Sequence, residues 1–181
     1  MKITLPDGSV RKLEVGSNGL DIANDIGAGL AKAALAVSVN GIQKDLSDPI
    51  NEDSDVSIIT IDSDEGLEIM RHTLTAQVLA RAVKNLYPDA KLAIGPTIKD
   101  GFYYDFEFVK SITPNDLEKI EKEMQKIINS KSAIIKKLHS KKDALKVFGS
   151  NAEPYKESII NESEQEDNFQ LYYQENDEFV D

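Results

Sequence analysis

Few side chains in this 181-residue chain are able to do covalent or acid–base chemistry, and their types exclude several kinds of site. The chain has no cysteine, which rules out disulfides, zinc ribbons, iron–sulfur clusters and thiol nucleophiles built from its residues. Its two histidines, His72 and His139, are too few for a histidine-rich metal centre. His139 lies between two lysine clusters, so we expect a structural or solvated role for it. His72 is the better candidate for chemistry, although a surface or helix-start position is the simpler interpretation.

The chain offers no clear site for phosphate or nucleic acid. The glycine-rich segment 27–29 and the Gly–Pro pair at 95–96 lack the lysine and the serine or threonine that end a phosphate-binding loop. The net charge of −11 disfavours strong independent binding to a polyanion. That charge is uneven: −5 over 1–62, +3 over 63–151 and −9 over 152–181. Lysines between Lys126 and Lys146 are able to contact RNA phosphates, but solvated helix and strand faces explain them at least as well.

The elements that must position any site begin with a small sheet domain. Turn residues at 6–8 and at Asn40–Gly41 each separate two strand-like segments. Between these hairpins, apolar residues over 20–30 recur at helical spacing, and Gly27 and Gly29 are expected to stop the helix. A further strand follows. We therefore expect a ubiquitin-like β-grasp domain over the first 62 residues.

The remaining residues predict a second domain of mixed structure. Polar residues 62–66 form a linker, and a long amphipathic helix follows from about 67 to 86. Turn signals at Gly95–Pro96 and Asp100–Gly101 separate short strands, and Thr113 is a good cap for another helix. The fold class is therefore α+β, with a β-grasp domain at 1–62 and an α+β domain with a long helix and an antiparallel sheet at 63–181.

Short motifs in both domains resemble one family. PDGS, LDIA, GLAKAALA and VNG, between residues 6 and 41, resemble the TGS domain that opens threonyl-tRNA synthetases. The same module occurs in certain GTPases and stringent-response enzymes. EGLEIMRH, PYKESI and LYYQENDEFVD resemble the next domain of the bacterial synthetases, and GPTIKDGFYYDFE (95–107) is the most specific of these strings. The resemblance covers nearly the whole chain.

The resemblance implies an editing function. In that family the second domain hydrolyses serine wrongly esterified to threonine tRNA, and a downstream core attaches threonine using ATP, magnesium and zinc. Serine fits a pocket made for threonine, and one methyl group contributes only about 1–3 kcal/mol of discrimination, so a second site is needed. The expected partners are the acceptor arm of threonine tRNA and seryl-tRNA as substrate. We expect no cofactor in these residues, no membrane, a cytoplasmic location, and a homodimer only in the full-length parent.

The resemblance also implies which residues form the editing site. Family members carry HxxxH on the long helix; here His72 matches the first histidine and Gln77 replaces the second, one residue late. In an α-helix these two positions lie about 140° apart, so a helix bulge or a helix start after His72 is needed to bring them together. Glutamine is not a base near neutral pH. Lys156 would supply positive charge near the ester or ribose, Tyr172 a hydroxyl, and Asp181 a carboxylate for the serine ammonium or a water.

Each of these positions has a simpler interpretation. Lys156 fits a solvated lysine, Tyr172 a core residue, and Asp181 a disordered terminal one. The family's cysteine and another histidine would follow Asp181, so we expect a cut piece of a longer enzyme that is itself unable to deacylate or charge tRNA. The alternative is a non-catalytic adaptor that docks tRNA or protein through a degenerate editing-like domain.

Overall fold

The computed structural model describes residues 1–174 and 179–181, which divide into two compact units, Met1–Met70 and Arg71–Asp181. Both units combine helices with strands, so the expected α+β class is confirmed. Glu178, which was expected to begin a strand-like end, lies outside the described residues. Within the described part of the chain, no helix has the length and apolar character to cross a membrane.

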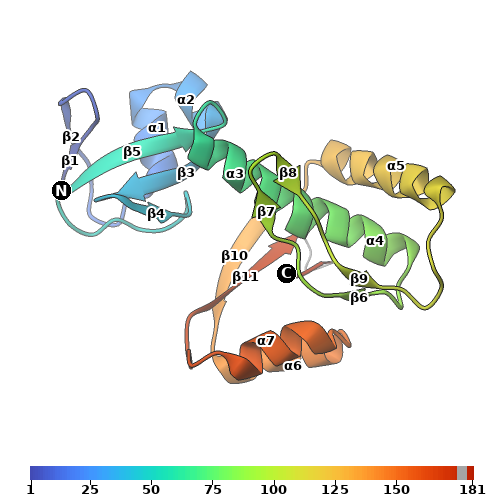
Figure 1. Ribbon diagram of the computed structural model, residues 1–181. Coiled ribbons are helices and arrows are strands. Elements are labelled where there is room, and N and C mark those ends of the chain that lie inside the picture. The colour runs from blue at the N-terminus through green and yellow to red at the C-terminus, as the bar shows by residue number, and fades with distance from the viewer. Residues whose placement is uncertain (175–178) are drawn as a thin grey trace. The chain divides into compact units, whose positions relative to one another are not determined.

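Unit 1 is a five-stranded sheet with two helices on one face (Figure 1). The strand order is β2-β1-β5-β3-β4, in which the β1–β5 pair is parallel and the other pairs are antiparallel. This is the β-grasp arrangement that the sequence predicts. Its elements are β1 (Lys2–Thr4), β2 (Val10–Lys12), α1 (Gly19–Ile26), α2 (Ala28–Ala33), β3 (Ala34–Val39), β4 (Ile42–Lys44) and β5 (Ser54–Thr60).

Local sequence signals explain most boundaries of unit 1. Asn40 and Gly41 both have positive φ (51° and 80°), as the tight turn between β3 and β4 requires. Asn18 caps α1 by accepting hydrogen bonds from the N–H groups of the first turn. The expectation that Gly29 stops this helix is wrong. One extended residue, Gly27, ends α1, and the chain then returns to helical backbone, so Gly29 lies inside α2.

One apolar core holds unit 1 together. Ile22 of α1 is fully buried against the sheet, where Ile3 and Val37 are also inaccessible to solvent. Leu5, Val39, Ile50 and Val56 complete the buried cluster. Ile3 and Leu5, and likewise Val37 and Val39, lie two residues apart, so their side chains point to the same face of the sheet and contribute to this core.

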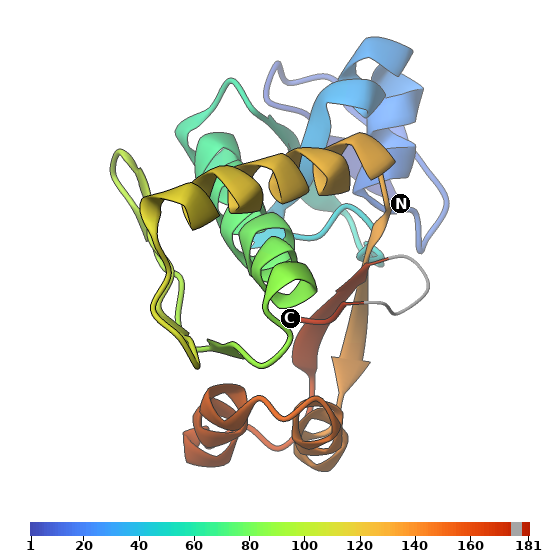
Figure 2. The ribbon, with the colours of Figure 1, turned by 90° about the vertical axis from the view of Figure 1, so that its right-hand side faces the viewer.

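A long interrupted helix runs from the last residues of unit 1 into unit 2. The helix expected at 67–86 is present, but it starts at Asp64 as α3 (Asp64–Thr73), so the last three residues of the expected linker are helical. It continues through a π-helical segment, η1 (Leu74–Leu79), into α4 (Ala80–Leu86). The cap at Ser63, whose hydroxyl accepts from Gly66 N, explains the earlier start. Helix α5 (Pro114–Ser130), capped as expected at Thr113, crosses α4 and buries Ile120 and Ile127 against it (Figure 2).

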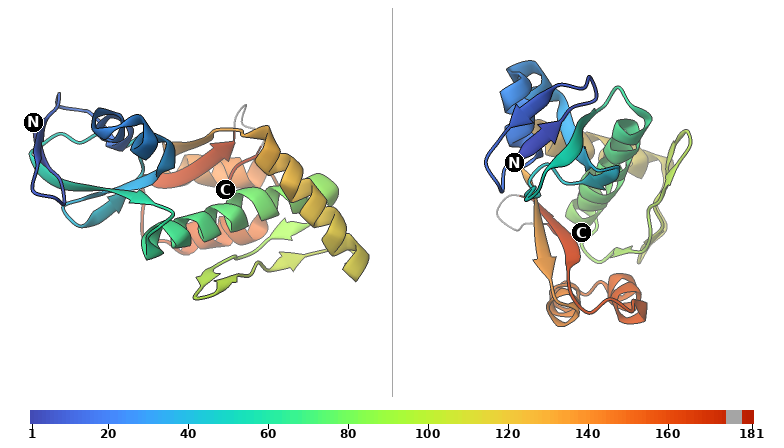
Figure 3. Two further views of the ribbon diagram at one scale, coloured as in Figure 1. Left: turned by 90° about the horizontal axis from the view of Figure 1, so that it is seen from above. Right: turned by 90° about the vertical axis from the view of Figure 1, so that its left-hand side faces the viewer.

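The strands in the described part of unit 2 form three two-stranded pairs. Four short strands, β6 to β9, follow one another as a twisted ribbon (Figure 3), and a separate pair, β10–β11, packs against α6 and α7. Val180 bridges to Tyr173 of β11, so the last described residues run antiparallel to that strand. The elements are β6 (Lys91–Leu92), β7 (Thr97–Ile98), β8 (Gly101–Phe102), β9 (Phe106–Glu107), β10 (Ile134–His139), α6 (Lys141–Ser150), α7 (Pro154–Glu162) and β11 (Phe169–Gln174).

Candidate functional site

A pocket of about 440 Å³ lies in unit 2, among segments that are far apart in the sequence. The long helix, the β6–β7 connection, α7 and the last described residue each contribute side chains to it. Three predicted site residues, His72, Lys156 and Asp181, line this pocket, whereas Gln77 and Tyr172 do not. The other lining residues are Ala76, Ala93, Ile94, Gly95, Pro96, Thr97, Tyr104 and Ile159.

Lys156 and Asp181 form an ion pair at the pocket wall. Their side chains are only 15% and 16% exposed, so Lys156 is not a solvated lysine. Asp181 is also ordered, because its backbone N–H and C=O form hydrogen bonds with the backbone of Tyr172 at 3.0 and 2.7 Å. A shielded pair of this kind interacts more strongly than an exposed one, and it presents a cation and an anion side by side.

The long helix does contain a bulge after His72, the π-helical segment Leu74–Leu79. A π-helix bonds each N–H to the carbonyl five residues back, as Ala80 N does to Thr75 O, and so accommodates one extra residue. Ala76, rather than Gln77, then lines the pocket with His72. The bulge keeps the helix continuous but does not place the glutamine in the site.

Gln77 lies in a buried polar cluster instead. Its side-chain N–H donates to Tyr172 O at 3.3 Å, and its Oε1 accepts from Gln174 Nε2 at 3.3 Å. Arg81 in turn donates to Gln174 Oε1. Because Gln77 and Gln174 are only 4% and 3% exposed, these bonds fix the π-helical segment against β11, the strand that holds Asp181.

Tyr172 reaches the site through its backbone. Its side chain is half-buried, although its neighbours in the sequence, Leu171 and Tyr173, are core residues. Its hydroxyl lies 3.4 Å from Gln170 Oε1. The geometry therefore supports neither the expected role of this hydroxyl in the pocket nor the alternative of a core position for the Tyr172 side chain. Alternation along β11 explains both outcomes, because it turns Tyr172 to the face opposite its two buried neighbours.

Sequence reasoning did not single out Tyr104, which also lines the pocket. Its ring stacks on Phe106, with centroids 4.5 Å apart, and passes so close to Gly95 that a Cβ there would lie 2.4 Å from Tyr104 Cδ2. Burial raises the pKa of the Tyr104 phenol, and the negative charges of Asp181 and Glu153 raise it further. The hydroxyl therefore stays protonated and can donate a hydrogen bond. The aromatic run beside Gly95–Pro96 was the available signal.

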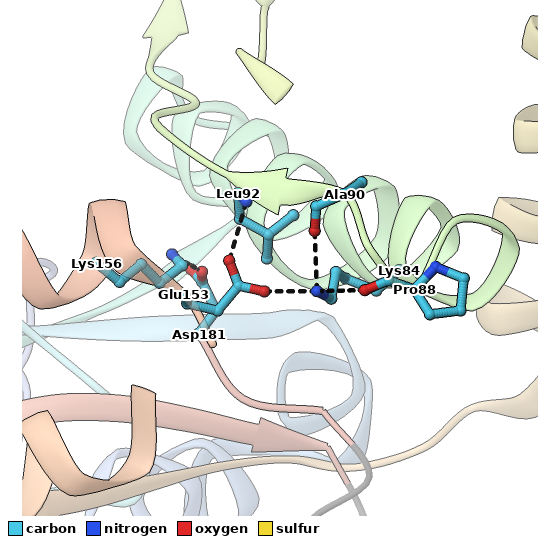
Figure 4. A network of polar contacts seen from close by, with 7 residues as sticks. All are labelled: Lys84, Pro88, Ala90, Leu92, Glu153, Lys156 and Asp181. Carbon is cyan, nitrogen blue, oxygen red and sulfur yellow. Dashed lines mark hydrogen bonds and ion pairs between the residues drawn. The ribbon is translucent and has the colours of Figure 1, made fainter. Parts of the chain in front are cut away.

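A second ion pair, between Lys84 and Glu153, lies next to residues of the pocket, and no sequence motif predicted it. The Glu153 carboxylate accepts from Lys84 Nζ at 2.7 Å and from Leu92 N at 3.0 Å (Figure 4). Lys84 also donates to Pro88 O and Ala90 O, both at 2.9 Å. Nothing in their local sequence distinguishes this lysine and glutamate from surface ones.

The lysine-rich stretch and His139 lie outside the pocket. His139 Nε2 is 3.1 Å from the Tyr173 hydroxyl, in agreement with the expected structural role. Lys137 stacks over the Tyr173 ring, and Lys141 donates to Ser163 O at 2.7 Å. No group of three or more potential metal ligands occurs among residues 1–174 and 179–181.

Comparison with known proteins matches both units. Residues 1–60 match the TGS domain family. The chain is 45% identical over 179 residues to Threonine--tRNA ligase of Acidithiobacillus ferrooxidans, which covers 99% of this chain and 27% of that protein. Identity to Threonine--tRNA ligase of Acetivibrio thermocellus is 45% over 181 residues, or 100% of this chain and 28% of the relative. Threonine--tRNA ligase 1 of Bacillus subtilis is 44% identical over 174 residues, which cover 96% of this chain and 27% of that protein.

Residues 1–60 are a TGS domain. The whole chain is homologous to the N-terminal region of threonine--tRNA ligases and spans about a quarter of the length of these relatives. The resemblance drawn from the short motifs is therefore confirmed. His72, Lys156 and Asp181 all lie after the residues that match the TGS domain, within the range that these ligases also match.

Proposed function

We propose that this chain is the N-terminal part of a threonyl-tRNA synthetase and that its second domain, residues 63–181, receives the 3′ end of tRNA mischarged with serine. The observation that carries the proposal is the shielded Lys156–Asp181 pair, which shares a pocket with His72 in a chain that is 45% identical over 179 residues to a threonine--tRNA ligase. The parent enzyme would attach threonine using ATP, magnesium and zinc held outside these residues. We place that parent in the cytoplasm and its dimer contacts outside this chain.

The pocket chemistry suits an aminoacyl ester. The serine ammonium would bind Asp181, because a carboxylate has acceptor sites left after pairing with one lysine. Lys156 would then lie beside the ester or ribose oxygens, where its charge favours the negative charge that builds up when water attacks the carbonyl. His72 and the protonated Tyr104 hydroxyl would supply hydrogen bonds to the ribose. Hydrolysis breaks the bond between the acyl carbon and the ribose oxygen, and that oxygen takes up a proton.

We further propose that residues 1–181 bind this substrate without hydrolysing it. Gln77 faces β11 and is not a base, so His72 lacks the second histidine that the family motif implies. The implied cysteine and further histidine are also not among these residues. General acid–base catalysis contributes typically about 10²–10⁴-fold, so binding alone is a poor substitute for it.

Two measurements on seryl-tRNA test this proposal. The chain should bind a non-hydrolysable seryl-tRNA, in which an amide replaces the ester, at least about tenfold more tightly than uncharged tRNA. Lys156→Met should remove that preference, whereas Lys122→Met, an exposed lysine of α5, should leave it unchanged. Incubation with ester-linked seryl-tRNA should give no turnover above buffer. Equal affinity for charged and uncharged tRNA contradicts the binding role, and clear turnover contradicts the inactivity.

The burial of Gln77 away from the pocket favours one other function, a non-catalytic adaptor. In that case the domain would bind tRNA or a protein, and it would not recognise an amino acid attached to the tRNA. Equal binding of charged and uncharged tRNA, together with no effect of Lys156→Met, would support the adaptor instead of the editing domain.

A further inference from the structure

Glu153 is a buried carboxylate with no part in the proposed chemistry. The residue is 3% exposed, and both carboxylate oxygens are engaged, one by the Lys84 ammonium and the other by Leu92 N. Removing a carboxylate from water is costly, and only close pairing and hydrogen bonding offset that cost, so such a group needs an explanation.

The position of Glu153 supplies that explanation (Figure 4). It directly precedes α7, and Lys156 follows one helical turn later. Leu92 directly precedes the pocket wall formed by 93–97. Lys84 holds the carbonyls of Pro88 and Ala90, which connect α4 to β6. One carboxylate thus ties together the start of α7, the start of the pocket wall and the end of the long helix.

We propose that Glu153 is a positioning residue for Lys156. It fixes the first turn of α7 against Leu92 and Lys84, and this turn sets where the Lys156 ammonium meets Asp181 in the pocket. The link is directional, because two hydrogen bonds to different segments define the carboxylate plane. An apolar side chain of the same size would fill the space without fixing the helix. The positioning is a property of this fold, and only its effect on substrate rests on the proposed function.

The test measures the Lys156–Asp181 pair directly by NMR of the lysine ε-carbon in the full chain. In the wild type, Asp181→Asn should shift the Lys156 signal, because the pair is broken. In a Glu153→Gln background the same substitution should shift it by less than half as much, because the pair is already disturbed. Glu162→Gln, at the exposed end of α7, is the matched control and should leave the wild-type shift intact.

A second variant keeps the test valid if Glu153→Gln folds poorly. Lys84→Met/Glu153→Leu removes both charges together, a change that is often neutral for stability. It should unfold as cooperatively as the wild type and still lose the Asp181-dependent shift of Lys156. A full wild-type shift in this folded double variant would overturn the proposal.

Ligand affinity provides the functional arm. The probe is an amide of serine with 3′-amino-3′-deoxyadenosine, and we expect both Glu153 variants to bind it about tenfold more weakly, since small misplacements of a binding group are costly. Unchanged affinity in both variants would overturn the role in the site. If the wild type does not bind the probe, the proposed function fails, while the NMR experiment still decides the positioning.

Discussion

The two units of this chain are stabilised in different ways. Unit 1 has one apolar cluster between a five-stranded sheet and its helices. In unit 2, the described residues form three smaller apolar clusters, one of them between α4 and α5, and the strands form only two-stranded pairs. Buried polar contacts connect these parts: Glu153 with Lys84, and Gln77 with Gln174. The difference indicates that apolar packing is enough to define the TGS domain, whereas the pocket depends on polar links between distant segments.

The largest effect should follow from a cavity in unit 1. Ile22→Ala empties a fully buried position of α1 and should lower the free energy of unfolding by about 4 kcal/mol, measured by urea denaturation. Ile42→Ala, at a position 65% exposed, is the control and should change it by less than about 0.5 kcal/mol. Similar losses in both variants would contradict the idea of one dominant core.

The next effect should appear in unit 2, without any change in an apolar core. Lys84→Met leaves the Glu153 carboxylate buried without its cation and should cost about 3 kcal/mol, read from hydrogen exchange of unit 2 amides. The control is Lys126→Met, whose lysine is 75% exposed in its pair with Glu123 and should contribute little. If the two variants are equally stable, polar links do not hold unit 2 together.

Helix caps should have a smaller effect. Asn18 accepts two hydrogen bonds from the first turn of α1, so Asn18→Ala should cost about 1 kcal/mol in thermal or urea unfolding. Asn18→Asp keeps the acceptor and should retain most of the stability. A loss above 2 kcal/mol would mean that this cap also supports the core of unit 1.

The smallest effect concerns pH and the wall of the pocket. Tyr104 has a raised pKa because it is buried near two carboxylates, so the folded state holds its proton more tightly than the unfolded state does. Its contribution to stability is therefore complete below the usual tyrosine value of about 10 and declines as the pH rises above it. Tyrosine ionisation is followed by the rise in ultraviolet absorbance as the pH increases. Tyr104→Phe should leave this rise unchanged in the folded protein up to pH 11. A smaller rise in this variant would show that Tyr104 ionises normally and is not shielded.

Local signals in the sequence explain why most of unit 1 could be predicted. Asn40–Gly41 specifies a tight turn, and the burial of Ile3 and Val37 follows from alternation along the strands. Thr113 likewise marks the start of α5 correctly. Such signals depend only on neighbouring residues, so no knowledge of tertiary contacts is needed to use them.

The features that could not be predicted depend on distant contacts. Lys84 and Glu153 are 69 positions apart, and either one alone is indistinguishable from a surface residue. The one-residue offset between His72 and Gln77 allowed a bulge, but only the hydrogen bonds to β11 determine which way Gln77 points. The motifs identified His72, Lys156 and Asp181 as candidate site residues. That all three line one pocket follows only from the fold.

The central claim is that Asp181 in this pocket reads the ammonium of a misplaced serine. The direct measurement is calorimetric titration with two amides of 3′-amino-3′-deoxyadenosine, one of serine and one of glyceric acid, which lacks the ammonium. The wild type should bind the serine amide at least about tenfold more tightly, and Asp181→Asn should bind both amides equally. Equal binding by the wild type, or a preference that survives in Asp181→Asn, would contradict the claim.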